Sequence, residues 1–112
     1  MSKITTHILD TSLGKPASNI RVFLEKYNND SWEPIAEGIT NEDGRIKDLL
    51  KNNDTLDLGK YRMIFETEKY FSDRNIKTFY PKVSIEFYIY DDSHYHIPLL
   101  LSPFGYSTYR GS

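Results

Sequence analysis

The fold is indicated most directly by the stretch VSIEFYIY, at residues 83–90. Apolar residues stand at positions 83, 85, 87 and 89, and serine, glutamate and tyrosine stand between them. Because successive side chains of a strand point to opposite faces, this alternation predicts a long strand with one face toward a core. We therefore begin from a β-sheet and work outward along the chain.

Further strands are predicted on both sides of this stretch. They lie at residues 4–9, 20–25, 32–39, 61–66, 94–101 and 105–110. Pro34 cannot donate a ladder hydrogen bond, so its strand is expected at a sheet edge or with a bulge. Residues 41–44 predict a turn in which Gly44 is free to take a positive φ. One helix is predicted at 67–75, with Thr67 as its cap.

The length and the strand spacing limit the architecture. A chain of 112 residues has room for one domain, spanning residues 1–112. Seven or eight short strands with one short helix predict an all-β sandwich. The net charge is −2, which provides no basic footprint for nucleic acid. There is no cysteine, and this excludes disulfide scaffolds, iron–sulfur clusters and a cysteine nucleophile.

The sequence also contains no membrane or export signal. No stretch approaches the roughly 18 apolar residues of a membrane span, and the first residues have no apolar core of a secretory signal. We therefore expect a cytoplasmic protein without a membrane partner.

The three histidines are the first candidates for chemistry. His94 and His96 are two residues apart on a predicted strand, so both rings project from one face, and His7 could add a third imidazole. Three histidines with an open fourth position can hold a catalytic zinc ion. The commoner interpretation is that each is a partly exposed strand residue, and the HxH pattern occurs often by chance. His7 and Thr5 are expected to share the face opposite Thr6.

An arginine and the end of the chain are the other candidates. Arg45 follows the predicted turn, and a guanidinium there either is simply solvated or binds an anion. Residues 106–112 are polar and aromatic, although they follow an apolar strand. Chain ends usually fray, but a tail with two tyrosines is expected to dock against the protein.

Four segments together carry a family resemblance. They are THILDTSLGKPA at 6–17, TNEDGR at 40–45, HYHIPLLLSP at 94–103 and YRGS at 109–112. In this order they resemble the 5-hydroxyisourate hydrolases, the transthyretin-like enzymes of urate breakdown. The resemblance covers nearly the whole chain, and the terminal YRGS is its most specific part.

The resemblance implies a fold, a reaction and a site. It implies a transthyretin-like sandwich of two antiparallel sheets that opens the ring of 5-hydroxyisourate to 2-oxo-4-hydroxy-4-carboxy-5-ureidoimidazoline. The implied catalytic residues are His7, Arg45 and His96. Substrate binding is implied for His7, Arg45, Tyr109 and Ser112. No metal and no other cofactor is implied, and His94 is left without a catalytic role.

The chemistry follows from these residue types. One histidine would take a proton from water, and Arg45 would stabilise the oxyanion. The other histidine would orient the water or protonate the leaving nitrogen; which of the two is the base stays open. The alternative is a non-enzymatic small-ligand carrier on the same fold.

The resemblance further implies a homotetramer with its sites where subunits meet. A second reason to expect a homotetramer is the amount of apolar surface. One small sandwich is not expected to bury both the apolar run at 97–101 and the tyrosine-rich tail.

Overall fold

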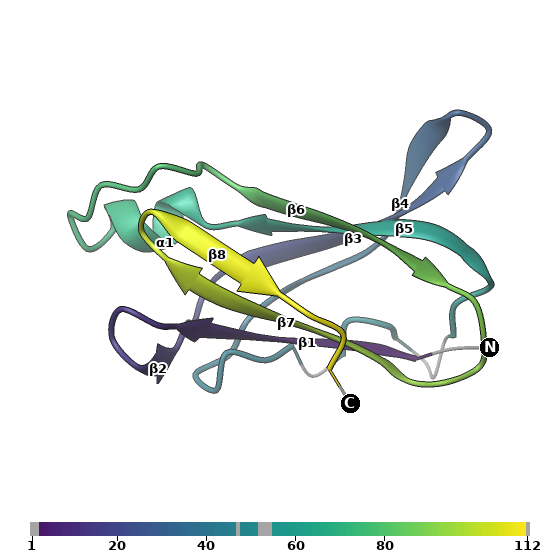
Figure 1. Ribbon diagram of the computed structural model, residues 1–112, viewed down its shortest axis with the longest axis horizontal. Coiled ribbons are helices and arrows are strands. Elements are labelled where there is room, and N and C mark those ends of the chain that lie inside the picture. Colours follow the sequence, from purple (N-terminus) through teal and green to yellow (C-terminus); the bar gives the residue numbers. More distant parts are fainter. Residues whose placement is uncertain (1–2, 47, 52–54, 112) are drawn as a thin grey trace.

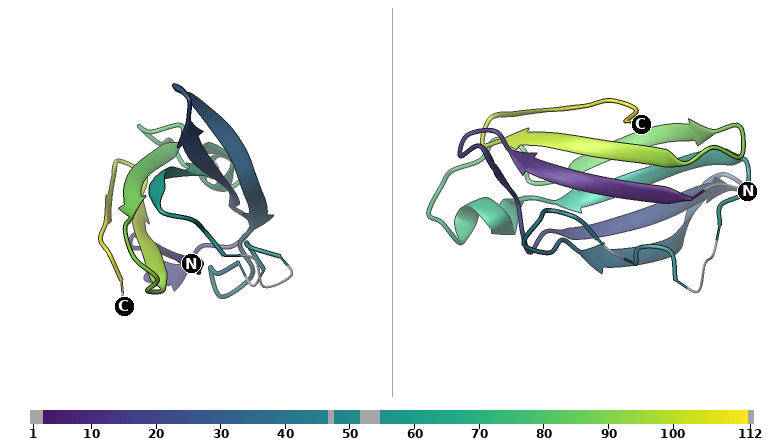
Figure 2. Two further views of the ribbon diagram at one scale, coloured as in Figure 1. Left: turned by 90° about the vertical axis from the view of Figure 1, so that its right-hand side faces the viewer. Right: turned by 90° about the horizontal axis from the view of Figure 1, so that it is seen from below.

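The chain forms two four-stranded sheets packed face to face (Figures 1 and 2), and one short helix lies in the connection between two neighbouring strands of the same sheet, β5 and β6. The computed structural model describes residues 3–46, 48–51 and 55–111. One sheet has the order β2-β1-β7-β8 and the other has the order β4-β3-β5-β6. The elements are β1 (Ile4–Asp10), β2 (Lys15–Pro16), β3 (Arg21–Asn28), β4 (Ser31–Ile39), β5 (Gly59–Glu66), α1 (Glu68–Ser72), β6 (Val83–Ile89), β7 (Tyr95–Ser102) and β8 (Gly105–Thr108).

The predicted fold class is confirmed by this arrangement. All pairs of neighbouring strands are antiparallel except β1 and β7, which run parallel in the middle of their sheet. Parallel pairing of two strands from opposite ends of the chain brings the N-terminal and C-terminal motifs together. No helix among the described residues is long and apolar enough to cross a membrane.

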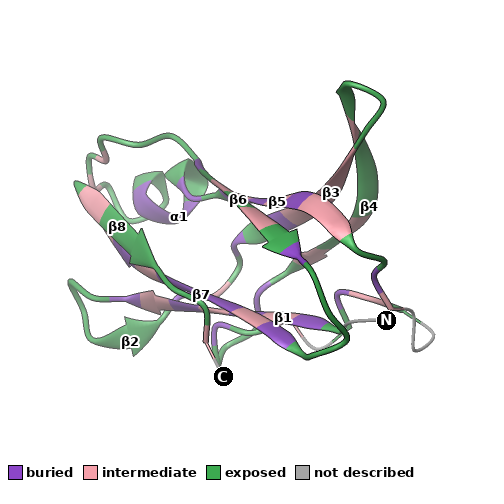
Figure 3. Ribbon diagram, turned by 45° about the vertical axis from the view of Figure 1, so that its right-hand side comes forward, coloured by how far each residue is buried: buried purple, intermediate pink, exposed green. Residues whose placement is uncertain are grey.

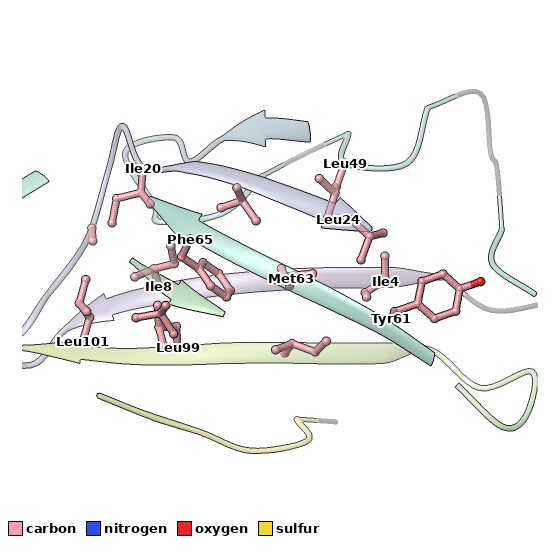
Figure 4. Close-up of a cluster of buried hydrophobic side chains, with 14 of the residues drawn as sticks. Ile4, Ile8, Ile20, Leu24, Leu49, Tyr61, Met63, Phe65, Leu99 and Leu101 are labelled. Atoms are coloured by element: carbon pink, nitrogen blue, oxygen red, sulfur yellow. The ribbon is translucent and has the colours of Figure 1, made fainter. Parts of the chain in front are cut away.

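The core lies between the sheets and follows the alternation in the sequence. Along β1, every second residue from Ile4 to Asp10 is buried, and the residues between are half-buried. Large apolar side chains of both sheets interlock there, as Figure 4 shows for Ile8, Leu24, Phe65 and Leu99, all fully buried. Each such side chain contributes about 1.5–3 kcal/mol by leaving water.

A tight hairpin joins β3 and β4. Asn29 and Asp30 both have positive φ angles, 52° and 65°, which suits the two-residue turns that join twisted strands. The register shifts between Leu24 and Glu25, because Leu24 pairs with Ala36 and Glu25 pairs with Pro34. Pro34 therefore lies at a bulge in an edge strand, and both interpretations offered for it are confirmed.

The predicted helix is too long, and Thr67 occupies the predicted cap position without capping the helix through its side chain. α1 has five residues and ends at Ser72, and Asn75 has a left-handed φ of 57°. Thr67 has helical dihedral angles and makes no capping hydrogen bond with its side chain. A capping side chain needs the extended backbone that Thr67 lacks. Its hydroxyl is instead buried, without a hydrogen-bond partner among the described residues.

Candidate active site

His7 and His96 lie on adjacent strands and share one face of their sheet. In the parallel pairing of β1 with β7, Thr5 is opposite His96 and His7 is opposite Pro98. Because Thr6 is buried in the core, the side chains of Thr5 and His7 point to the outer face, as predicted. His96 projects from the same face, since side chains at paired positions lie on the same side of a sheet. The two predicted catalytic histidines are thus brought together.

A tight turn places Arg45 beside His7. Arg45 forms an antiparallel bridge with His7, and the Ile8 amide donates to the Gly44 carbonyl at 2.9 Å. Gly44 has a φ of 73°, and a β-carbon there would collide with the Ile8 carbonyl oxygen. The side chain of Asn41 closes the turn, because its Oδ1 accepts from the amide of Arg45 at 3.1 Å. The predicted turn is confirmed, and its glycine lets Arg45 approach the strand.

The C-terminal segment lies on the other side of the histidine pair. The Gly111 amide donates to the His96 carbonyl at 2.8 Å. This pairing continues the register of β8 on β7, in which Thr108 faces Leu99. A β-carbon on Gly111 would lie 2.5 Å from Cδ2 of the His96 ring. The tail therefore approaches His96 as closely as a glycine allows. The C-terminal segment, drawn in yellow, runs alongside β7 in Figure 2.

Arg110 docks the tail onto the protein. Its guanidinium lies over the Tyr95 ring, 4.3 Å from the centroid, and its Nη2 donates to Oγ of Ser93 at 2.8 Å. The expectation of a docked tail is confirmed for its described part. Tyr109 is 59% exposed and lines a groove of about 360 Å³ together with residues of β6. Ser112 lies outside the described residues, so its predicted role in substrate binding stays a prediction.

Both histidines are held in an environment that favours their neutral form. Burial lowers the pKa of His7, and the charge of Arg45 lowers it further, whereas Asp43 partly opposes both. Burial also lowers the pKa of His96, as do the nearby Arg45, His7 and His94. A neutral imidazole at neutral pH can accept a proton, which a general base requires.

The hydroxyl of Thr5 joins two of the histidines. Its Oγ1 lies 2.8 Å from Nδ1 of His96 and 2.8 Å from Nε2 of His94. The family resemblance implies no catalytic role for His94, and the strand alternation predicts only the face on which Thr5 lies. The one signal available was the spacing of Thr5 and His7, which places that hydroxyl on the histidine face.

The three-histidine zinc site gains no support from this geometry. Among the described residues, no group of three or more histidine, aspartate or glutamate side chains is arranged to hold a metal ion. Nδ1 of His96 and Nε2 of His94 both point to one hydroxyl, which supplies a hydrogen-bond partner for each.

Sequence comparison places these residues in a family context. A model of the HIUase/transthyretin family matches residues 4–111. A 5-hydroxyisourate hydrolase from Salmonella typhimurium is 46% identical over 110 residues, which is 97% of this chain and 80% of the relative. A second, from Rhizobium meliloti, is 43% identical and covers 98% of this chain and 96% of its own length.

Solved structures share the fold. The 5-hydroxyisourate hydrolase of Klebsiella pneumoniae superimposes with a TM-score of 0.88, at 38% identity and with both chains fully covered. Transthyretin from Sparus aurata superimposes with a TM-score of 0.89, at 30% identity, over 96% of this chain and 95% of its own. The same sandwich therefore occurs in a hydrolase and in a transthyretin, and the residues of the site must separate the two.

Proposed function

Because the chain belongs to the HIUase/transthyretin family, we propose that it is a 5-hydroxyisourate hydrolase. It opens the ring of 5-hydroxyisourate to 2-oxo-4-hydroxy-4-carboxy-5-ureidoimidazoline, a step of purine catabolism toward allantoin. The observation that carries this proposal is the convergence of His7, Arg45 and His96 on one outer face. A carrier would not need two neutral imidazoles beside a guanidinium.

The reaction needs a base, an oxyanion stabiliser and an acid. One histidine takes a proton from water as the water oxygen bonds to the ring acyl carbon. Arg45, permanently charged, stabilises the oxyanion that forms on the acyl oxygen. The ring C–N bond then breaks, its electron pair stays on nitrogen, and that nitrogen receives the proton taken from water. The other histidine either orients the water or passes this proton on to the nitrogen, so both rings end neutral. The net change is the addition of one water molecule, and it requires no cofactor.

The C-terminal segment completes the site in this proposal. Tyr109 and Ser112 bind the flat, polar substrate together with His7 and Arg45. In support, the Gly111–His96 pairing fixes the neighbouring tail residues next to the histidine face. Because Tyr109 is exposed and lines a groove beside β6, its ring is available to meet a substrate at a junction between subunits.

We further propose a homotetramer with its sites at the subunit junctions. The apolar run at 97–101 was expected to exceed what one sandwich buries, and this is wrong, since Ile97, Leu99 and Leu101 are buried within the chain. The exposed aromatics remain as support. Tyr88 of edge strand β6 stacks on Tyr90, which follows that strand, and both rings are exposed. The other edge strand beside the groove, β8, is mostly exposed (Figure 3). A monomer by light scattering at micromolar concentration would contradict this proposal.

The proposal also covers the domain organisation, the location and the partners of the protein. Residues 1–112 act as one domain, the protein works in the cytoplasm, and its partner is the small-molecule substrate rather than nucleic acid or a membrane.

Absorbance spectroscopy tests the activity directly. Freshly generated 5-hydroxyisourate decays spontaneously, and the protein is expected to accelerate the loss of its absorbance. The matched control is the double variant His7→Ala/His96→Ala, which should leave the decay near the spontaneous rate. A non-enzymatic carrier would bind the compound without accelerating its decay, and that result would overturn the proposal.

A further inference from the structure

The contact between Thr5 and two histidine rings has a chemical consequence. A hydroxyl has a single proton, so Thr5 donates to only one of the two nitrogens that lie 2.8 Å away. Toward the other ring it acts as an acceptor, and that nitrogen must carry a hydrogen. The protonation of His96 at Nδ1 is therefore linked to the state of His94 at Nε2.

The position of this contact leaves one nitrogen of His96 for the reaction. Nδ1 is engaged by Thr5, so Nε2 is the nitrogen that meets water or substrate. If His94 accepts from Thr5, the hydroxyl accepts from Nδ1–H of His96, and Nε2 presents a lone pair. If His94 donates, the neutral His96 carries its proton on Nε2 and is unable to act as a base there.

We propose that His94 acts through Thr5 as a positioning residue, which holds the proton of His96 on Nδ1 and presents the Nε2 lone pair as the general base. The inference rests on the proposed hydrolase function and deepens it by assigning the base. It follows the usual logic of an activated base, in which a third group orients the ring and fixes its tautomer.

The surroundings of the two rings agree with a hydrogen bond that runs from Nδ1–H of His96 to the Thr5 hydroxyl and from that hydroxyl to His94. His96 is half-buried on β7 and faces Arg45, His7 and His94, three groups that disfavour a positive charge on its ring. His94 is exposed just before β7, and its Nε2 lies 2.8 Å from the Thr5 hydroxyl, so this contact orients its ring toward His96.

Nitrogen NMR of the full-length protein reads the tautomers without relying on activity. Two-bond ¹H–¹⁵N correlations of the histidine rings should show His96 protonated at Nδ1 and bare at Nε2. Thr5→Val removes the hydroxyl at constant shape, and His94→Ala removes its partner. Both should shift His96 toward the Nε2–H tautomer. His7, which does not contact Thr5 in this way, serves as the internal reference.

Kinetics of the same variants separate positioning from structure. Thr5→Val should lower kcat about 10-fold or more with little change in KM, which is less than the 10²–10⁴-fold loss expected on removing a base. His94→Ala should lower kcat in the same direction. Thr5→Ser restores the hydroxyl and His94→Gln restores an acceptor at the position of Nε2, so both should recover most of the rate. Thr6→Val is the matched control, because Thr6 donates to the Ile97 carbonyl on the opposite face.

Two results would overturn the inference. One is a wild-type His96 protonated at Nε2. The other is a Thr5→Val protein with unchanged kcat and an unchanged His96 tautomer. If the wild type failed to accelerate decay of 5-hydroxyisourate, the proposed function would fail. The tautomer measurement would still show whether His94, through Thr5, holds the proton of His96 on Nδ1.

Discussion

Gly111→Ala is the substitution whose effect follows most directly from the geometry of the site. The added β-carbon would lie 2.5 Å from Cδ2 and 3.2 Å from Cγ of the His96 ring. Ordinary van der Waals contact begins at 3.4 Å, so the ring and the tail must separate by about 0.9 Å. His96 cannot yield freely, because its Nδ1 is hydrogen-bonded to Thr5. The substitution therefore displaces the tail, the histidine ring or both.

The expected cost is kinetic rather than structural. A misplacement of about 1 Å in a catalytic group can lower the rate about 10²-fold, and we expect a loss of that order in kcat/KM for 5-hydroxyisourate. Gly111 is outside the hydrophobic core, so the free energy of unfolding should change by no more than about 0.5 kcal/mol.

Gly105→Ala is the matched control. Gly105 lies in β8, six residues earlier, and a β-carbon there would meet only Oγ of Ser102 at an ordinary 3.7 Å. This variant should keep its turnover and its melting temperature. If Gly111→Ala kept the turnover of the Gly105→Ala protein, with unshifted His96 ring resonances, the close approach of the tail to His96 would be refuted.

Four further predictions concern the histidine face. His7→Ala, His96→Ala and Arg45→Ala should each lower turnover by about 10²–10⁴-fold, and the losses should not add in the triple variant, because these groups act as a unit; near-normal turnover in any one of them would remove that residue from the proposed mechanism. Because the pKa of both histidines is lowered from 6.5, turnover should persist somewhat below pH 6.5 and fall as the pH decreases further. Arg45→Gln should move this acid limb to higher pH, whereas Arg45→Lys should not, and identical pH profiles would contradict the electrostatic role. Deleting residues 109–112 should abolish most turnover while circular dichroism still reports a folded sandwich, and a folded, fully active truncation would defeat the assignment of the tail. Exhaustive chelation should leave the rate unchanged, and its loss with recovery on adding zinc would revive the three-histidine metal site.

Much of the fold was readable from local pattern. Strand alternation at 83–90 predicted β6 and its buried face, since a period of two is a property of the strand itself. The turn at Gly44 was predicted because glycine readily takes a positive φ, and the bulge at Pro34 was predicted because proline has no N–H to donate. The helix was less predictable, because a segment of about two turns depends on packing more than on its own sequence.

The contacts that link Thr5 to His94 and His96 were beyond such reasoning. The residues are 89 and 91 positions apart, and only the register of β1 on β7 brings them together. Hydrophobic alternation predicts which face each residue occupies but not which strands are neighbours. The family resemblance supplied His7, Arg45 and His96 as a set, but it did not supply the hydroxyl that joins two of the histidines.

The register of β1 connects the energy of the core to the chemistry of the site. If β1 slipped by one residue against β7, every side chain would exchange faces, and His7 would enter the core in place of Ile8. The slip would expose Ile4 and Ile8, at a cost of about 1.5–3 kcal/mol for each. It would also break the bond from Thr6 to the Ile97 carbonyl, 2.7 Å long in the native register. These costs are a large part of the stability of a small domain, so the same burial that folds the sandwich also holds Thr5 opposite His96. The apolar positions of β1 are therefore as necessary to the histidine face as the histidines themselves.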